Sequence, residues 1–233
     1  MTMIGDDLQH VNNRIAKACV TAGRNPGEVR LLAVSKTFGP DAVREAHAAG
    51  QSAFGENYVQ EGLDKIEALA DLRATLEWHC IGPLQSNKTR PVAEQFDWVH
   101  SVDRLKIAER LSAQRPAQLA PLNVCLQVNV DGGPNKSGVP PEEAVALALA
   151  VAALPQLRLR GLMAIPEPAE SFDAQRELFL RAHAVYRAIG EAGIALDTLS
   201  LGMSADLEAA ISAGSTMVRV GTAIFGGRAR KPA

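Results

Sequence analysis

The residue that points most directly to chemistry is a lysine at the end of an apolar run. Lys36 follows residues 31–34, which are all apolar, so its alkyl chain leaves a segment that we expect to be a buried strand. Burial penalises the ammonium form and makes it easier for a lysine to lose its proton. The neutral amine is the form that attacks an aldehyde to give a Schiff base. Taken alone, Lys36 is better explained as a lysine that caps the sheet edge with its amino group in water.

Two loops near the end of the chain have the composition of a phosphate site. In the first, Ser204 fits the N-cap of a helix that opens with residues 205–208, which would leave N–H groups facing an anion. Asp206 argues mildly against this, because a carboxylate there repels an anion. In the second, Gly221 lets the backbone approach an oxyanion and Thr222 adds a hydroxyl. Either loop alone is ordinary turn chemistry. Both together with Lys36 favour a phosphate-bearing aldehyde such as pyridoxal phosphate.

Three more polar residues acquire a meaning beside such a ligand. Arg219 could reach a pyridine nitrogen, and an always-charged guanidinium would keep that nitrogen unprotonated; for an isolated arginine, a surface salt bridge is the default. Asn57 could donate to a phenolic oxygen, and it is about as well explained as the cap of a helix starting at Tyr58. His79 is more simply a structural histidine than a base.

Short apolar runs alternate with helical patterns along the chain, and the candidate residues follow these runs. Several runs are almost continuously apolar, as expected for parallel strands buried on both faces. We predict strands at residues 29–35, 53–55, 77–80, 98–101, 124–130, 157–163, 198–201 and 217–220.

Strand and helix alternation of this kind predicts a parallel sheet, and eight units in 233 residues predict a (β/α)8 barrel in a single domain over residues 1–233. Apolar residues spaced by three and four between Ile4 and Ala22 predict an extra helix before the first strand. A doubly wound open sheet is the alternative, although no GxGxxG motif follows the first strand. In a barrel the functional site lies at the carboxyl ends of the strands.

Composition excludes several classes of function. The chain has 24 Lys and Arg against 26 Asp and Glu, so no basic excess favours nucleic-acid binding. No apolar run reaches membrane-spanning length, and residues 1–10 lack the pattern of a signal peptide. Cys19, Cys80 and Cys125 have no metal-like pairing and are expected to be free thiols. We therefore expect a cytoplasmic protein, with no metal site and no membrane or nucleic-acid partner, that acts as a monomer.

The sequence closely resembles the pyridoxal-phosphate homeostasis protein family, whose fold is similar to the N-terminal domain of alanine racemase. The resemblance runs almost from end to end. It rests on six segments, LAVSKT (32–37), FGENYVQE (54–61), WHCIGPLQSNK (78–88), RGLMAIP (160–166), LSLGMSAD (199–206) and RVGTAIFG (219–226).

The resemblance implies a cofactor and a set of residues that bind it. Lys36 matches the lysine that forms an aldimine with pyridoxal 5'-phosphate, and Arg219 matches the arginine at the pyridine nitrogen. Family members have no established turnover; they are thought to buffer the cofactor or deliver it to apo-enzymes, with effects on amino-acid and keto-acid balance. The further residues implied are Asn57 beside the ring, the phosphate binders Ser204, Gly221 and Thr222, and the adjacent Ser200 and Met203.

Two parts of the sequence depart from the pattern of the family. Cys80 stands where the family usually has an aromatic residue, which we interpret as a change in packing. Residues 132–134 replace acids that usually precede Lys136, so a role for Lys136 as a second amine is in doubt. Neither departure touches the expected cofactor pocket.

Two other functions are compatible with parts of the pattern. An amino-acid racemase needs a base on each face of the ring, and Tyr58 is the sole candidate for the second base, because Tyr186 lies on an apolar helix face. A barrel enzyme that acts on a sugar phosphate through a lysine Schiff base would use the same phosphate loops but gives Arg219 no role.

Overall fold

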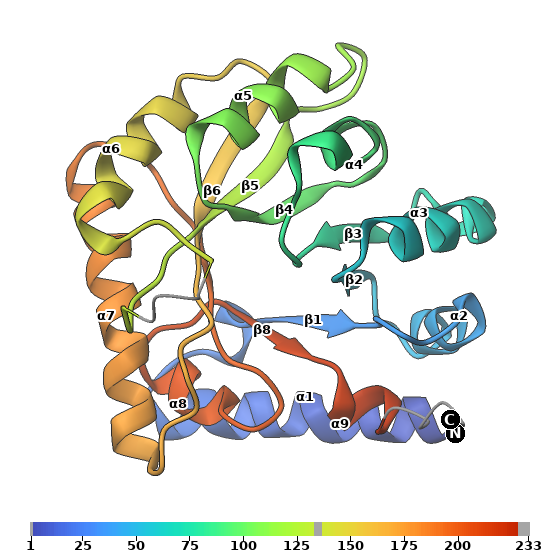
Figure 1. The fold of residues 1–233 in the computed structure, drawn as a ribbon. Helices are drawn as coiled ribbons and strands as arrows, with labels where there is room; N and C mark the ends of the chain where they lie inside the picture. The colour runs from blue at the N-terminus through green and yellow to red at the C-terminus, as the bar shows by residue number, and fades with distance from the viewer. Residues whose placement is uncertain (1, 133–136, 228–233) are drawn as a thin grey trace, which may run out of the picture.

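The chain closes into a barrel of parallel strands, as the alternation of strand and helix predicts. The computed structural model describes residues 2–132 and 137–227. The strands pair in sequence order and β1 pairs with β8, so the alternative of an open doubly wound sheet is wrong (Figure 1). The strands are β1 (Arg30–Val34), β2 (Ala53–Glu56), β3 (Glu77–Cys80), β4 (Trp98–Val102), β5 (Leu122–Gln127), β6 (Leu157–Met163), β7 (Thr198–Ser200) and β8 (Met217–Val220).

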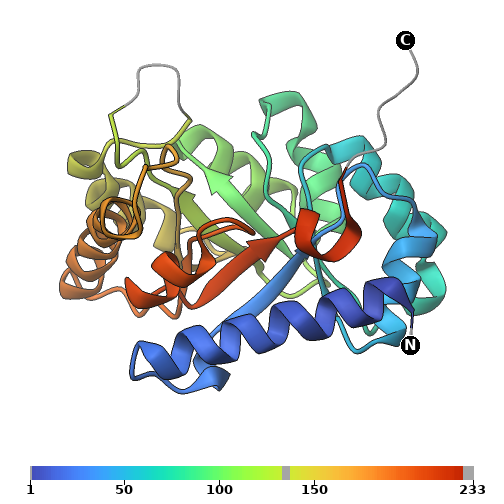
Figure 2. The ribbon, with the colours of Figure 1, turned by 90° about the horizontal axis from the view of Figure 1, so that it is seen from below.

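Helices surround the strands on the outside (Figure 1). The helix expected before the first strand is present as α1, and it packs against α2, α8 and α9 across the outer side of the barrel (Figure 2). The helices are α1 (Met3–Thr21), α2 (Pro40–Ala48), α3 (Val59–Ala68), α4 (Thr89–Gln95), α5 (Leu105–Gln114), α6 (Pro141–Ala152), α7 (Phe172–Glu191), α8 (Leu207–Ser212) and α9 (Thr222–Phe225).

The expected strands are confirmed, with ends that move by up to three residues. The largest difference is in β5, which ends at Gln127 rather than continuing to Val130. Val128 N–H still donates to Met163 O of β6, but Asn129 N–H donates to Val139 O instead. The apolar run therefore outlasts the strand, because Val128 and Val130 stay buried in the loop.

The two faces of each strand pack into different layers. On β1, Leu31 and Ala33 join the large apolar layer between the sheet and the helices. Leu32 and Val34 point to the other face, where they cluster inside the barrel with residues of β2 and β8. Because side chains alternate along a strand, Lys36 continues the face of Leu32 and Val34 and lies at the mouth of the barrel interior.

The interior of the barrel is polar to an unusual extent. Barrel interiors are generally filled by branched apolar side chains, but here His79, His100, Ser200 and Arg219 are all buried. Among the described residues no helix is both long and apolar enough to cross a membrane.

Candidate functional site

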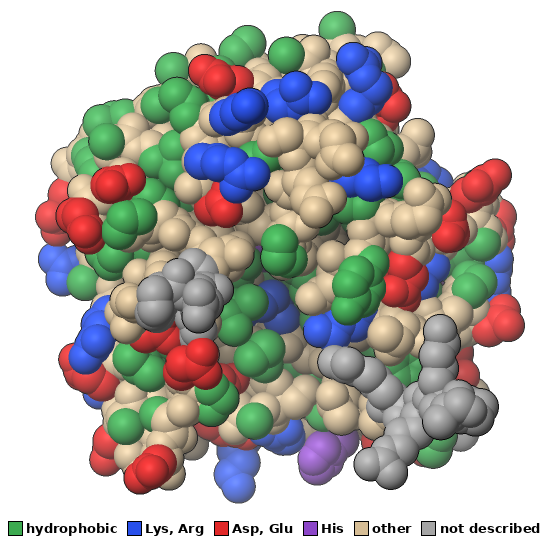
Figure 3. Space-filling view, viewed as in Figure 1, with side chains coloured by type: hydrophobic (Ala, Val, Ile, Leu, Met, Phe, Trp, Pro, Cys, Tyr) green, Lys and Arg blue, Asp and Glu red, His purple; other side chains and the backbone are tan. Residues whose placement is uncertain are grey.

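A pocket of about 290 Å³ opens at the carboxyl ends of the strands, where a barrel of this type is expected to carry its site. The space-filling view shows a hollow near the middle of one face, with hydrophobic side chains at its border and basic side chains inside it (Figure 3). The lining residues come from the last residues of β1 and β8 and from the segments that follow β1, β2, β3, β6, β7 and β8. They include Lys36, Asn57, Met203, Ser204, Arg219, Gly221 and Thr222.

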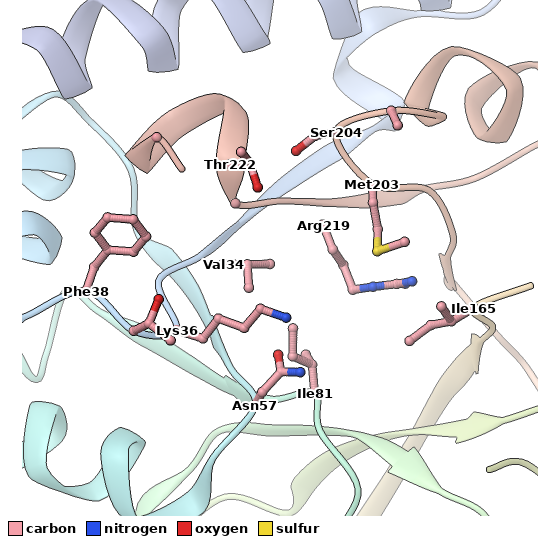
Figure 4. A pocket seen from close by; sticks show the side chains of 14 residues that line it. Val34, Lys36, Phe38, Asn57, Ile81, Ile165, Met203, Ser204, Arg219 and Thr222 are labelled. Atoms are coloured by element: carbon pink, nitrogen blue, oxygen red, sulfur yellow. The ribbon is translucent and has the colours of Figure 1, made fainter. Parts of the chain in front are cut away.

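The pocket has two sides and a floor, which is formed by Arg219 (Figure 4). We call the part formed by Lys36 and Asn57 the amine side, and the part formed by Ser204, Gly221 and Thr222 the hydroxyl side. The hydroxyls of Ser204 and Thr222 lie close to one another, and the amino group of Lys36 points into the space between the two sides (Figure 4). The pocket thus combines an amine, two hydroxyls and a guanidinium.

Asn57 does not cap a helix, contrary to one of the two roles that the sequence allows. Helix α3 begins at Val59, its N-cap is Tyr58, and no side chain caps it. The side-chain oxygen of Asn57 is buried and has no hydrogen-bond partner in the described structure. Buried polar atoms are generally paired, so this oxygen marks a place where a ligand of the pocket can complete a hydrogen bond.

A buried cluster of charges supports the backbone on both sides of Lys36. Nζ of Lys65 lies 2.7 Å from the backbone oxygen of Ser35, 2.7 Å from Glu56 Oε1 and 2.7 Å from Glu61 Oε1. The same Glu61 oxygen accepts the backbone N–H of Thr37. Both neighbours of Lys36 are therefore held by one ion cluster, which we call the Lys65 cluster (Lys65, Glu56 and Glu61).

The Lys65 cluster also explains an unusual backbone conformation. Thr37 has φ of 70°, in the left-handed region that a β-branched residue rarely adopts. The hydrogen bond from its N–H to Glu61 offsets part of the cost of this conformation. Burial raises the pKa of Glu56, although Lys65 and Ser35 act in the opposite direction. Sequence reasoning missed the cluster; the Glu61 and Lys65 spacing of four residues on α3 was its only signal.

On the hydroxyl side, the prediction that Ser204 caps a helix is wrong. Residues 204–206 form a turn, and α8 begins at Leu207 with Asp206 as its N-cap residue. The carboxylate of Asp206 accepts the backbone N–H of Met203, so it closes the turn rather than lying free at the mouth. Arg14 of α1 donates to the backbone oxygen of Ser204 over 3.1 Å and also binds Glu208.

The glycine expected to approach a ligand is closely packed from behind. A Cβ at Gly221 would lie 3.0 Å from the backbone oxygen of Val34, so a side chain there would push the ends of β1 and β8 apart. Thr222 is the first residue of the short helix α9 and lines the pocket beside it. Gly221 and the hydroxyl of Thr222 therefore lie at the same edge of the pocket.

Arg219 forms the floor of the pocket and is not the surface salt bridge that an isolated arginine suggests. Its side chain is buried and donates to the backbone oxygen of Ser200 over 2.6 Å, to Ser200 Oγ over 2.8 Å and to the backbone oxygen of Ala164 over 3.0 Å. Burial lowers the pKa of Arg219 to about 10, so the guanidinium stays charged at neutral pH. Ser200 lies beneath this guanidinium and does not line the pocket.

The remaining candidates are placed elsewhere. His79 is buried inside the barrel, in agreement with a structural histidine, and neither Tyr58 nor Tyr186 is among the residues lining the pocket. Lys136 and residues 133–134 lie outside the described residues. Cys80 is buried among apolar side chains, and all three cysteines are free. Within residues 2–132 and 137–227, no group of His, Cys, Asp and Glu could hold a metal ion.

Comparisons with known proteins place the chain in a family. The family model described as "Alanine racemase, N-terminal domain" matches residues 7–229. A "Pyridoxal phosphate homeostasis protein" of Pseudomonas aeruginosa is 60% identical over 228 residues, which cover 98% of this chain and 97% of the relative. A protein with the same description from Escherichia coli strain K12 is 55% identical and covers 98% of each chain.

Solved structures agree with this placement. A protein of unknown function from Bifidobacterium adolescentis has a TM-score of 0.90 at 37% identity, covering 96% of this chain and 94% of that one. PipY of Synechococcus elongatus, solved with PLP bound, has a TM-score of 0.80 at 39% identity, covering 91% of this chain and 100% of PipY. An alanine racemase from Corynebacterium glutamicum shares the fold at 18% identity and a TM-score of 0.66, covering 95% of this chain and 60% of the racemase. The chain therefore belongs to the alanine racemase N-terminal domain family and, within it, to the pyridoxal phosphate homeostasis proteins.

Proposed function

We propose that this chain binds pyridoxal 5'-phosphate, holds it covalently through Nζ of Lys36, and buffers it or delivers it to apo-enzymes that depend on it. Through those enzymes it would influence amino-acid and keto-acid balance. The observation that carries the proposal is the convergence of Lys36, Arg219 and two hydroxyls on one pocket. The description of the close relatives and the PLP bound to PipY support the identity of the ligand.

The residues of the pocket fit this cofactor on independent grounds. The buried oxygen of Asn57 lacks a partner, and an amide can offer either its oxygen or its N–H groups to a polar substituent of the ring. Gly221 lines the pocket, and a Cβ there would press on Val34, so this backbone position can approach a phosphate only as glycine without moving β1. We assign the phosphate to Ser204, Gly221 and Thr222, and Met203 to the wall beside them.

Arg219 and Ser200 would define the ring end of the site. The charged guanidinium of Arg219 faces the pocket from its floor, where it would donate to a ring nitrogen and not accept a proton from it. Ser200 contributes through Arg219, because its hydroxyl accepts from the guanidinium and does not line the pocket. The bound cofactor would supply an aldehyde and an electron-withdrawing ring.

Several features of the chain support binding rather than turnover. An unprotonated pyridine withdraws electrons less strongly than a protonated one, and Arg219 favours the unprotonated form. Racemisation needs a second base, but neither tyrosine is among the residues lining the pocket. The side chains that line the pocket can therefore hold the cofactor in one orientation, and neither tyrosine of the chain is placed among them to act as a second base.

The test of the proposal is the transfer of the cofactor. Protein loaded with pyridoxal phosphate is mixed with an apo-aminotransferase, and the regain of transaminase activity is timed against the release of free cofactor. We expect reactivation by the wild type and none by Lys36→Ala treated in the same way. A wild type that retains no cofactor after gel filtration would refute the proposal, and deuterium at the α-carbon of L-alanine in deuterated water, at an enzymatic rate, would favour a racemase.

A further inference from the structure

A continuous chain of hydrogen-bonded side chains runs through the barrel interior to the floor of the pocket. His79 Nε2 lies 2.7 Å from Glu77 Oε1, and His79 Nδ1 lies 2.9 Å from His100 Nε2. His100 Nδ1 lies 3.2 Å from Ser200 Oγ, which is in turn 2.8 Å from Nη1 of Arg219. Glu77 opens β3 at the end of the barrel opposite the pocket, so this chain spans the interior.

The groups at the two ends of this series of hydrogen bonds determine which atom donates and which accepts at each link. A guanidinium only donates hydrogen bonds and an ionised carboxylate only accepts them. Ser200 Oγ accepts from Arg219, so its own proton is free to go to His100 Nδ1. His100 must then carry its proton on Nε2 and donate to His79 Nδ1, and His79 must donate from Nε2 to Glu77. Every link fits one pair of tautomers, and both imidazoles are neutral.

Burial and charge favour this arrangement. Burial lowers the pKa of His79 and of His100, although the hydrogen bond to Glu77 opposes the shift at His79. At Glu77, burial acts to raise the pKa, but the hydrogen bond with His79 and the charge of Arg30 act against it and lower the pKa below its ordinary value. Arg30 lies 2.8 Å from Glu77 at the same end of the barrel. The carboxylate is therefore ionised at neutral pH and fixes the accepting end.

Packing holds the two imidazoles in place. The ring of His79 stacks on Trp98, with centroids 5.1 Å apart and an interplanar angle of 12°, and it meets His100 edge to face at 5.1 Å. Both histidines are fully buried. A polar chain in such a place is costly unless every member is paired, which the two tautomers achieve.

We propose that His79 and His100 are positioning residues for Arg219. They orient the hydroxyl of Ser200 so that its lone pairs face the guanidinium. The carboxylate of Glu77 at the far end of the barrel fixes the donor and the acceptor at every hydrogen bond between it and Ser200. The two backbone oxygens that Arg219 also contacts fix where the guanidinium lies. Ser200 Oγ is the one acceptor of Arg219 among these three that depends on the proton positions of its neighbours. The effect on the cofactor rests on the function proposed above.

The first part of the test measures the tautomers of the two histidines directly, with no cofactor present. Nitrogen-15 NMR of the imidazoles in the wild-type protein should show His79 and His100 protonated on Nε2 and not on Nδ1. A proton on Nδ1 of His100, or a charged imidazole at neutral pH, would overturn the direction of the chain. This arm does not depend on whether the protein binds pyridoxal phosphate.

The second arm reads the consequence for the pocket. His79→Phe keeps the aromatic stack on Trp98 but removes the acceptor of His100, so we expect His100 to lose its single tautomer. The affinity for pyridoxal phosphate should fall about tenfold, the size expected for weakening one hydrogen bond to a charged group, and the absorption band of the bound cofactor should shift. Met163→Leu, which changes apolar packing inside the barrel, should do neither.

The outcomes of the two arms separate the possible failures. If His79→Phe binds the cofactor with the affinity and absorption band of Met163→Leu, the positioning role is wrong. If the wild type binds no pyridoxal phosphate but shows the expected tautomers, the proposed function is wrong, while the direction of the hydrogen bonds from Arg219 to Glu77 is confirmed. Should His79→Phe not fold, Glu77→Gln replaces it, with Arg30→Gln as its control: loss of the carboxylate should mix the tautomers of His100, and loss of Arg30 alone should not. Equal tautomers in these two variants would overturn the proposal.

Discussion

The amine side and the hydroxyl side of the pocket are held in place by different means. Behind Lys36, the Lys65 cluster binds the backbone of both neighbouring residues, and Lys65 and Glu56 are 4% and 0% exposed. The hydroxyl side is held by a glycine at position 221, by a turn that Asp206 closes and by a partly exposed arginine of α1. In the proposed function Lys36 is a covalent anchor, which needs one fixed direction. The phosphate proposed for the other side needs only backbone groups and hydroxyls, with little fixed charge.

The largest effect is expected from removing the centre of the Lys65 cluster. Lys65→Met leaves the buried carboxylate of Glu56 without its cation, and breaking a buried pair in this way costs about 3–5 kcal/mol. Urea unfolding should therefore show a strongly reduced free energy. Arg187→Met, which breaks an exposed ion pair with Glu191, should leave the midpoint almost unchanged. A small effect of Lys65→Met would show that the amine side does not depend on the cluster.

A somewhat smaller effect is expected at the backbone of the hydroxyl side. Gly221→Ala places a Cβ 3.0 Å from the backbone oxygen of Val34, and such overpacking costs about 1–3 kcal/mol. Because the strain lies directly behind the position proposed for the phosphate, we expect weaker binding of pyridoxal phosphate in equilibrium titration. Gly39→Ala has open space around its Cβ and serves as the control. Equal affinities in the two variants would contradict the assignment of the phosphate.

The contact between α1 and the hydroxyl side predicts a modest change. Arg14→Ala removes the donor to the backbone oxygen of Ser204, so the turn should be less well ordered and the affinity for the cofactor should fall about threefold to tenfold, as for one lost hydrogen bond. Asn13→Ala removes an exposed neighbour on the same helix that pairs with Gln9. If both variants bind equally well, α1 has no part in holding the pocket.

The smallest effect is expected from the carboxylate of Asp206. Burial raises its pKa, although the N–H of Met203 and the charge of Arg219 act against this. A raised pKa means that ionisation of Asp206 costs stability, so its contribution is lost as pH rises from the ordinary value through the raised one. Asp206→Asn keeps an acceptor for Met203 and removes a negative charge that repels the proposed phosphate. The affinity for pyridoxal phosphate at neutral pH should therefore rise about twofold to threefold. Titrations at pH 5 and 7.5 should show less gain at the lower pH.

The fold could be predicted from the sequence because the strands are continuous apolar runs separated by regular helix signals. The residues that line the pocket were largely predictable too, since Lys36 and Gly221 follow such runs directly. The Lys65 cluster was not, because charged residues four apart on a helix are typical of a solvated surface and nothing local marks their burial. Ser204 was placed at the pocket for the wrong local reason, because it lies in a turn closed by the hydrogen bond from Met203 N–H to Asp206 and not at a helix N-cap.

The hydrogen bonds that connect His79 and His100 to Arg219 could not be predicted from the sequence either. Each histidine alone is best interpreted as a structural residue, and His100 carried no signal of its own. Their connection to Arg219 depends on strands β3, β4, β7 and β8 meeting across the barrel interior. Sequence patterns describe which face of one strand is buried, but they do not describe which residues meet across a closed sheet.

The proposed covalent link at Lys36 is tested most directly by reduction and mass spectrometry. The protein is loaded with pyridoxal phosphate, treated with borohydride, digested and analysed by peptide mass. We predict a single phosphopyridoxyl adduct, on the peptide that contains Lys36. No adduct, or an adduct on Lys65 or Lys136 in place of Lys36, would contradict it.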